Sequence, residues 1–248
     1  VAVQLYTLRF FGSLDERLAA VAEAGYDGVE TVGTHDLTAE ALKAKLAEHG
    51  LAACSSHSSP AELFGDLEGV LRFNETLGTD TVVLPWLGQD ERPSTAAGWR
   101  ELGARVGDLA RRAEAAGMRL LYHNHDFEMR RYEGERALDL LFEAAGDALG
   151  LELDLAWVVR GGEDPLELLG RYRTRVPRVH VKDLAAQGAG AEEGGWADVG
   201  HGRLDWSTLL SAARDAGAEW FIVEHDEPRD PLRTIRRSLE TVRALSRT

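Results

Sequence analysis

Four short apolar segments of the sequence each contain, at or near their end, a side chain that a divalent metal ion binds well. The segments are Arg119–His123, Gly150–Asp154, Arg178–Lys182 and Trp220–Glu224. Imidazole nitrogens and carboxylate oxygens together form mixed sites for ions such as Zn²⁺, Mn²⁺, Fe²⁺, Co²⁺ or Mg²⁺. The sequence therefore predicts one divalent ion, of unspecified identity, held by His123, Asp154, His180 and Glu224.

The alternation of side chains within these segments predicts which face carries the chemistry. Successive side chains of a strand point to opposite faces, so His180 and Lys182 share one face while the neighbouring valines take the other. Aliphatic faces suit packing under helices, so the polar faces are expected to point inward. In parallel αβ proteins, ligands bind at the carboxyl ends of the strands, where these residues lie. Gln4 and Glu30, which also lie in strands, are expected to form an inner hydrogen-bonded layer.

The elements that would position these residues follow a repeating pattern of a strand, a helical stretch and a glycine. The predicted strands are Val1–Tyr6, Asp27–Thr31, Leu51–His57, Thr81–Pro85, Met118–Asn124, Gly150–Leu155, Pro177–Asp183 and Glu219–His225. The predicted helices include one from Pro60 to Gly78 and one from Glu135 to Ala148. No linker interrupts the 248 residues, a length close to the roughly 250 of a (β/α)₈ barrel. The prediction is an α/β fold, a single (β/α)₈ TIM barrel that spans residues 1–248 as one domain.

Aromatic and histidine side chains gather near the predicted strand ends and are candidates for substrate binding. Of the eight histidines, all but His49 lie at these ends or in the loops that follow. For any one of them, a hydrogen-bonded core histidine is an equal alternative, but the clustering of the set favours function. Tryptophans in the same loops would stack on sugar rings, or equally plug the barrel mouth. The candidate substrate-binding residues are His57, Trp86, His125, Trp157, His201 and Arg203.

Three residues are candidates for acid–base or electrostatic catalysis. Glu224, at the metal, is expected to transfer the proton. Lys182 is the only one of three lysines at a strand end, where its ammonium would stabilise an enolate or, equally, pair with Glu152 or Asp154. Glu128, which follows the fifth strand, would reach the metal, contact the substrate or be solvated.

Net charge and cysteine content limit the classes of molecule that this protein is expected to bind. The net charge is −14, from 28 basic and 42 acidic residues, and such a field repels nucleic acid phosphates and anionic membranes. No signal peptide is expected, and no apolar segment approaches the roughly 18 residues of a membrane span. The one cysteine, Cys54, excludes an internal disulfide and fits a reducing cytoplasm. These features predict a cytoplasmic protein with no nucleic acid and no membrane partner, and they leave a homo-oligomer open. The net charge says little about a small substrate, and the small-molecule partner is expected from the candidate site residues.

Several motifs carry a family resemblance that covers nearly the whole chain. They are Gln4–Arg9, Gly25–Glu30, Tyr122–Glu128, Leu153–Trp157, His180–Asp183 and Val199–Trp206. These motifs resemble the xylose isomerase-like sugar phosphate isomerase/epimerase superfamily, which includes tagatose 3-epimerase, inosose dehydratase and, more distantly, endonuclease IV. The resemblance implies a TIM barrel with one divalent ion, bound in the epimerases by Glu, Asp, His and Glu. Asp154, His180 and Glu224 match the last three ligands, whereas His123 stands in place of the first glutamate.

The metal ligands and the resemblance together predict an isomerase or epimerase that acts on a sugar, keto-sugar or cyclitol. The metal would stabilise an enediolate, and loss of a β-hydroxyl would instead make the enzyme a dehydratase. Because His123 replaces a glutamate that binds metal and moves a proton, one-base chemistry is expected, as in isomerisation or elimination. Two other classes are DNA repair in the manner of endonuclease IV, which the acidic charge disfavours, and a sugar-binding barrel without catalysis.

Overall fold

Eight parallel strands close into a ring in the order β1-β12-β9-β8-β5-β4-β3-β2. The computed structural model describes residues 1–246. The barrel strands are β1 (Ala2–Gln4), β2 (Gly28–Val32), β3 (Ala52–His57), β4 (Thr81–Leu84), β5 (Arg119–His123), β8 (Gly150–Asp154), β9 (Arg178–Val181) and β12 (Trp220–Val223). Strand β1 pairs with both β2 and β12, which closes the ring. The predicted (β/α)₈ TIM barrel is confirmed.

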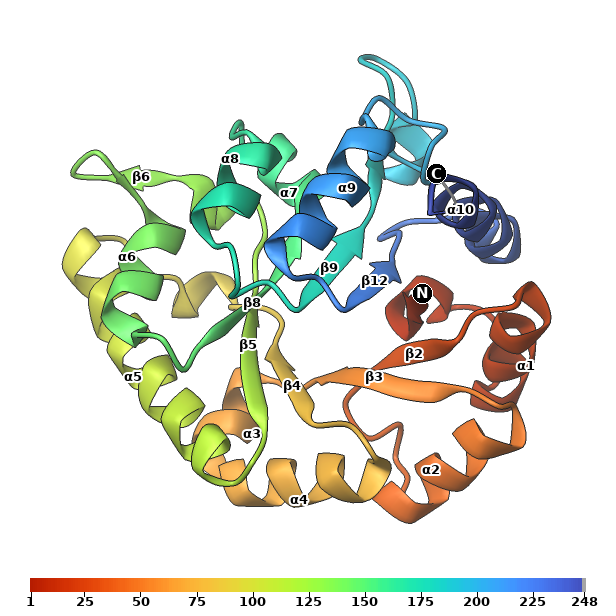
Figure 1. Ribbon diagram of the computed structural model, residues 1–248, viewed down its shortest axis with the longest axis horizontal. Coiled ribbons are helices and arrows are strands. Elements are labelled where there is room, and N and C mark those ends of the chain that lie inside the picture. The colour runs from red at the N-terminus through yellow and green to blue at the C-terminus, as the bar shows by residue number, and fades with distance from the viewer. Residues whose placement is uncertain (247–248) are drawn as a thin grey trace.

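Helices surround the strands on the outside of the barrel (Figure 1). They are α1 (Leu14–Ala24), α2 (Ala39–Glu48), α3 (Pro60–Gly65), α4 (Leu67–Leu77), α5 (Ala96–Ala115), α6 (Ala137–Ala145), α7 (Leu155–Arg160), α8 (Pro165–Arg171), α9 (Trp206–Ala216) and α10 (Pro231–Leu245). Short 3-10 helices are η1 (Leu5–Leu8), η2 (Gln89–Glu91), η3 (Phe127–Met129) and η4 (Ala191–Glu193). Among the described residues, no helix is both long and apolar enough to cross a membrane.

Local signals in the sequence fix where the helices begin and end. Ser13 and Glu16 form a capping box at the start of α1, which ends at Gly25 with a left-handed φ of 100°. Asp164 caps α8, whose first residue is Pro165. These sharp ends keep the connections short, so each strand enters and leaves the barrel in a defined register.

The strands divide their side chains between the two faces as the alternation predicts. Leu151, Leu153 and Val179 are fully buried in the hydrophobic core. The side chains between them, such as Glu152 and His180 on the neighbouring strands β8 and β9, are equally buried but contact one another inside the barrel. The barrel interior is therefore a polar layer. The candidate site residues lie at the carboxyl ends of the strands, which are called the upper end of the barrel here.

Three predicted element boundaries are wrong, each because a side chain or a hairpin competes locally. The first strand ends at Gln4, whose side chain accepts the Tyr6 N–H at 3.0 Å and starts η1. The helix predicted from Pro60 to Gly78 divides at Asp66, where φ is −147° and the carboxylate caps α4. Helix α6 starts two residues after the predicted Glu135, because β7 (Glu135–Arg136) pairs with β6 (Arg131–Tyr132).

The long loop after β9 is folded around one buried carboxylate. Strand β10 (Asp183–Leu184) pairs with β11 (Trp196–Ala197) to form a short antiparallel ribbon. The carboxylate of Asp183 accepts hydrogen bonds from the backbone N–H groups of Leu184, Gly200, Gly202 and Leu204 and from Trp206 Nε1. These five donors hold the loop against the upper end of the barrel.

Candidate metal centre and substrate cavity

The four predicted metal ligands come together at the upper end of the barrel. His123, Asp154, His180 and Glu224 lie at or just beyond the ends of β5, β8, β9 and β12. Each contributes one ligand atom to a group whose atoms all lie within 4.8 Å of one another. All four residues are buried, so the group lies inside the protein and not on its acidic surface.

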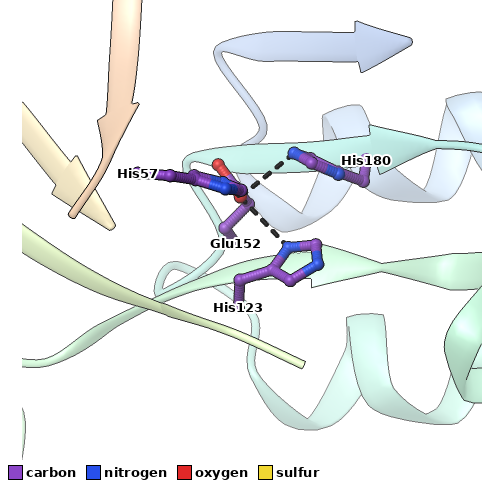
Figure 2. A group of neighbouring side chains, drawn as sticks. All are labelled: His57, His123, Glu152 and His180. Carbon is purple, nitrogen blue, oxygen red and sulfur yellow. Dashed lines mark hydrogen bonds and ion pairs between the residues drawn. The ribbon is translucent and has the colours of Figure 1, made fainter. Parts of the chain in front are cut away.

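A second, overlapping cluster, named the lower cluster here, consists of His57, His123, Glu152 and His180 and shares two histidines with the first (Figure 2). Oε1 of Glu152 lies 2.8 Å from His57 Nε2, 3.1 Å from His123 Nδ1 and 3.1 Å from His180 Nε2. Oε2 of Glu30 lies 2.7 Å from His180 Nε2 and 3.0 Å from His57 Nε2. Two buried carboxylates therefore face three imidazole rings.

The hydrogen bonds of Gln4 decide which role His57 takes in this cluster. The Gln4 oxygen accepts the Tyr6 N–H, so the Gln4 Nε2 group donates to Glu30 at 2.7 Å and faces His57 Nδ1 at 3.2 Å. Although burial opposes it, Glu30 and Glu152 raise the pKa of His57 to about 10, so its Nε2 keeps a proton. In the absence of an ion, His57 therefore donates through Nε2 to the carboxylates of Glu30 and Glu152.

His180 shows the opposite arrangement, which fits a metal ligand. Its Nε2 donates to Glu30, and its Nδ1 faces Glu224 Oε2 at 3.1 Å and Asp154 Oδ2 at 4.0 Å. A lone pair on Nδ1 would face two carboxylates, so this position requires a second proton or a cation. Despite burial, Glu152, Glu224 and Glu30 raise the pKa of His180 well above its ordinary value, which describes the ring without an ion. Metal ligation through one nitrogen, with the other donated to a carboxylate, is the usual arrangement of metal-bound histidine.

Asp154 is fixed so that one oxygen remains for the site. Its backbone N–H donates to Asn124 Oδ1 at 2.9 Å, and its carbonyl accepts from Asn124 Nδ2 at 3.2 Å. One carboxylate oxygen, Oδ1, accepts the Trp157 N–H as the cap of α7. The other, Oδ2, is buried, accepts no hydrogen bond from the described residues, and lies 3.1 Å from Lys182 Nζ and 4.0 Å from His180 Nδ1, which fits a metal ligand.

Lys182 lies among three carboxylates at the edge of the metal group. Its Nζ is 2.6 Å from Glu224, 2.9 Å from Asp226 and 3.1 Å from Asp154. Burial would lower the pKa of Lys182, but Asp154, Asp226 and Glu224 together raise it, so the side chain remains an ammonium. Burial works to raise the pKa of Glu224, but Lys182 and His180 hold it well below its ordinary value. The site thus contains an ionised carboxylate and a fixed positive charge side by side.

A cavity of about 610 Å³ opens over the metal group. Its walls include the predicted substrate residues His57, Trp86, His125 and Trp157. Nδ1 of His125 and Nε1 of Trp157 are buried polar atoms without a partner among the described residues. Burial, with His123 and Lys182 nearby, holds the pKa of His125 well below its ordinary value, so the ring is neutral. The cavity combines aromatic walls with free hydrogen-bonding atoms, as sugar sites require.

Three other predicted site residues lie outside this cavity. Glu128 is 1% exposed and accepts the Tyr122 hydroxyl and the His125 N–H, both at 2.7 Å. It is therefore neither solvated nor directed at the metal group, because both oxygens are used to hold the segment that carries His125. His201 is exposed and contacts Arg237 of α10. Arg203 lines a neighbouring cavity.

Comparison with known proteins identifies the family. The model of the xylose isomerase-like TIM barrel family matches residues 18–245. The chain belongs to the xylose isomerase-like TIM barrel family. The family resemblance predicted from the sequence motifs is thereby confirmed.

The relatives are similar along different lengths. An inosose dehydratase of Lacticaseibacillus casei is 29% identical over 153 residues, which cover 56% of this chain and 51% of the relative. This chain thus spans about half the length of that relative. The rhizopine catabolism protein MocC of Rhizobium meliloti is 25% identical over 245 residues, which cover 86% of this chain and 75% of the relative.

Solved structures share the fold. A sugar phosphate isomerase/epimerase of Parabacteroides distasonis superposes with a TM-score of 0.83 at 21% identity, over 98% of this chain and 93% of that one. The IolI protein with a bound zinc atom has a TM-score of 0.78 at 18% identity, over 98% and 96%.

Several residues of this xylose isomerase-like site are not among the sequence predictions. Asp226 and Arg160 line the cavity. Asp226 follows Glu224 by two positions, so the alternation of a strand offered a signal for it. Burial raises the pKa of Asp226 to about 6, with Lys182 opposing and Glu224 adding to the effect. Arg160 ends a short helix that the sequence did not predict, so no signal pointed to it.

Proposed function

We propose that this chain is a divalent-metal-dependent enzyme that moves a proton next to the carbonyl of a sugar, keto-sugar or cyclitol. The observation that carries the proposal is the orientation of His180, whose Nδ1 faces Asp154 and Glu224 while its Nε2 donates to Glu30. Asp154, His180 and Glu224 would hold the ion, with His123 beside them. The names of the inosose dehydratase relatives and the zinc in the IolI structure support this class.

The side chains around the metal group have distinct tasks. When bound, a divalent ion supplies Lewis acidity toward a substrate carbonyl and hydroxyl, which acidifies the C–H between them. Glu224 is ionised and lines the cavity, so it accepts the proton. Lys182 cannot act as a base, because its carboxylate neighbours keep it charged. Its buried ammonium faces Asp154, Glu224 and Asp226 and stabilises the ionised form of Glu224. Asp226, with a pKa of about 6, can return a proton near neutral pH.

His123 limits the chemistry to one face of the substrate. Its Nδ1 lies 3.1 Å from Glu152, and burial together with His180 lowers its pKa, so the ring is a neutral ligand. A neutral imidazole bound through one nitrogen and held through the other does not take a proton from carbon. The arrangement therefore favours isomerisation through an enediol. It equally favours dehydration, the second candidate, which matches the name of the inosose dehydratase relatives.

Metal analysis of two histidine variants tests the ligand assignment. We expect His180→Asn to lose the bound ion, because it removes a ligand. His57→Asn is the matched control: it changes the same cluster but removes no ligand, so near-stoichiometric metal should remain after purification. Elemental analysis by mass spectrometry measures both. Loss of metal in His57→Asn would place the ion in the lower cluster, and retention of metal in His180→Asn would show that His180 is not a ligand in either cluster; each result contradicts the proposal.

Exchange of substrate hydrogens tests the reaction. In D₂O, keto-sugars and inososes should gain deuterium with one stereochemistry, or lose water, without an inverted centre. Glu224→Gln should slow this by about 10²–10⁴-fold, the usual contribution of a general base. Glu143→Gln, an exposed change on α6, serves as the control. Ligand binding without exchange would instead indicate a sugar-binding barrel, and clean epimerisation would reveal a second base.

A further inference from the structure

A second cavity of about 440 Å³ adjoins the first and differs from it in charge. It lies between the end of α7 and the loop after β10, and its walls include Arg160, Gln187 and Arg203. No aspartate or glutamate is among its lining residues. The chain as a whole carries a net charge of −14, so a cavity with two arginines and no carboxylate departs from the surrounding surface.

Arg160 forms the wall between the two cavities, because it lines both. Its guanidinium stacks over the Trp196 ring at 3.4 Å from the ring centroid and donates to the Gly194 carbonyl at 2.8 Å. Trp196 also lines the first cavity. The charge of Arg160 is thus held beside the substrate cavity by aromatic stacking and one backbone contact. In the described part of the chain, no carboxylate oxygen forms an ion pair with it.

Arg203 lies at the opposite side of the second cavity. Its backbone N–H donates to the Leu184 carbonyl at 2.8 Å, which fixes the position of its main chain. Its side chain is exposed and forms no ion pair within residues 1–246. Nearby arginines behave differently: Arg233 and Arg237 of α10 both pair with Asp198, at 3.3 and 3.0 Å. Arg160 and Arg203 are thus the two charged side chains that line the second cavity, and neither forms an ion pair with a carboxylate of the described residues.

We propose that the second cavity is a subsite for an anionic group, a phosphate or a carboxylate, of the substrate. Guanidinium groups bind both anions through paired N–H donors. The shared wall at Arg160 lets one molecule place its reacting carbon over the metal group and its anion between Arg160 and Arg203. This inference rests on the proposed function for the reacting end and adds that the substrate is a sugar phosphate or a sugar acid.

Titration with inorganic phosphate tests the subsite without any reaction. The protein is used in metal-free and metal-loaded form, and binding is followed by calorimetry. We expect Arg203→Gln and Arg160→Gln to weaken phosphate binding about tenfold or more, the loss of one charge-assisted contact. Arg72→Gln, an exposed change on α4, removes the same charge elsewhere and should have no effect. Phosphate binding that needs the metal and ignores Arg203, or no binding at millimolar phosphate, overturns the subsite.

Three ligands of equal ring size identify the source of the anion. Glucose 6-phosphate, glucuronate and glucose are compared for binding to the wild type and to Arg203→Gln. Tighter binding of one anionic sugar, lost in Arg203→Gln, supports the subsite and names the group as phosphate or carboxylate. Equal binding of all three overturns it. Metal content is measured on the same samples. A protein that holds the ion but binds all three ligands equally contradicts the subsite alone, whereas a protein without the ion contradicts the proposed metal centre.

Discussion

The buried carboxyl group of Glu128 belongs neither to the metal ligands nor to the cavity wall, yet it holds the segment between them. It accepts one hydrogen bond from the Tyr122 hydroxyl and one from the His125 backbone N–H. Because Tyr122 adjoins His123 and His125 lines the cavity, Glu128 positions two rings of the site through the backbone. A residue with this task does not need to be charged.

This contact predicts a pH-dependent stability. Burial raises the pKa of Glu128 from 4.5 to about 7, against the hydrogen bonds from Tyr122 and His125. The folded state then binds the proton more tightly than the unfolded chain, so this stabilisation is present at acidic pH and lost as the pH rises from about 4.5 through 7. In Glu128→Gln the amide oxygen accepts the His125 N–H and the NH₂ group donates to the Tyr122 hydroxyl oxygen, so both contacts remain without a charge. Between pH 5 and 8, the unfolding free energy of the wild type should fall relative to this variant by up to about 3 kcal/mol.

Urea unfolding at four pH values measures this difference, with the exposed Glu143→Gln as the control that should follow the wild type. A constant difference between wild type and Glu128→Gln across the range would show that Glu128 does not titrate there.

At the residue scale, the sequence could predict which side chains reach the site but not how they are protonated. His123, Asp154, His180 and Glu224 were predictable because each ends or follows an apolar strand. The partner that sets the tautomer of His180 is Glu30, which is 150 positions away. Such contacts depend on the register of strands across the barrel, and local patterns contain no information about it.

The loop after β9 is the element on which both the cavity wall and the second cavity depend. The carboxylate of Asp183 accepts hydrogen bonds from five donors. The chain packs closely around it, because a Cβ added at Gly202 would lie only 2.3 Å from Asp183 Oδ1. The loop is therefore held by this carboxylate together with the buried side chains of Leu184, Trp196 and Val199.

We predict that Asp183→Asn destabilises the fold by about 2–4 kcal/mol, because an amide NH₂ would replace an oxygen that accepts N–H groups. Denaturant unfolding measures the loss, and limited proteolysis should cut first within residues 185–203. Asp164→Asn makes the same chemical change at the cap of α8, where asparagine serves as well as aspartate, and should be nearly neutral. Equal stability of both variants would refute the role of Asp183.

Elements were predictable where the local signals agreed, and not where a tertiary partner intervened. The strands before His123, Asp154 and Glu224 were predicted because each is a short apolar run between polar residues. Helix α7 was missed, because its apolar residues directly continue β8, and only the Asp154 cap separates the two elements. The second cavity, which needs α7 and the folded loop together, was therefore beyond a reading of the sequence.

At the scale of the whole molecule, the eightfold repeat predicted the barrel, since only ring closure pairs the first strand with the last. Closure also brings four buried carboxylates together around the metal group, those of Glu30, Glu152, Asp154 and Glu224. Lys182 lies among them and forms ion pairs with Asp154 and Glu224. Buried charge without compensation destabilises a fold. A divalent ion bound there would offset this charge, so the stability of the barrel and the proposed activity should depend on the same ion.

Removal of the metal should therefore destabilise the whole barrel. An ion that binds only the folded state adds about 2.7 kcal/mol at a hundred times its Kd, and each kcal/mol shifts the Tm of a chain this long by about 2–4 °C. Chelation should lower the Tm of the wild type by roughly 5–10 °C, and added metal should restore it. Asp154→Asn keeps the cap of α7 but removes a ligand oxygen, so its Tm should respond little to chelator or metal. Scanning calorimetry with and without chelator measures both proteins. If chelation lowers the Tm of Asp154→Asn as much as that of the wild type, the stabilising ion binds elsewhere. If chelation leaves the Tm of the wild type unchanged, metal binding does not stabilise the buried carboxylates.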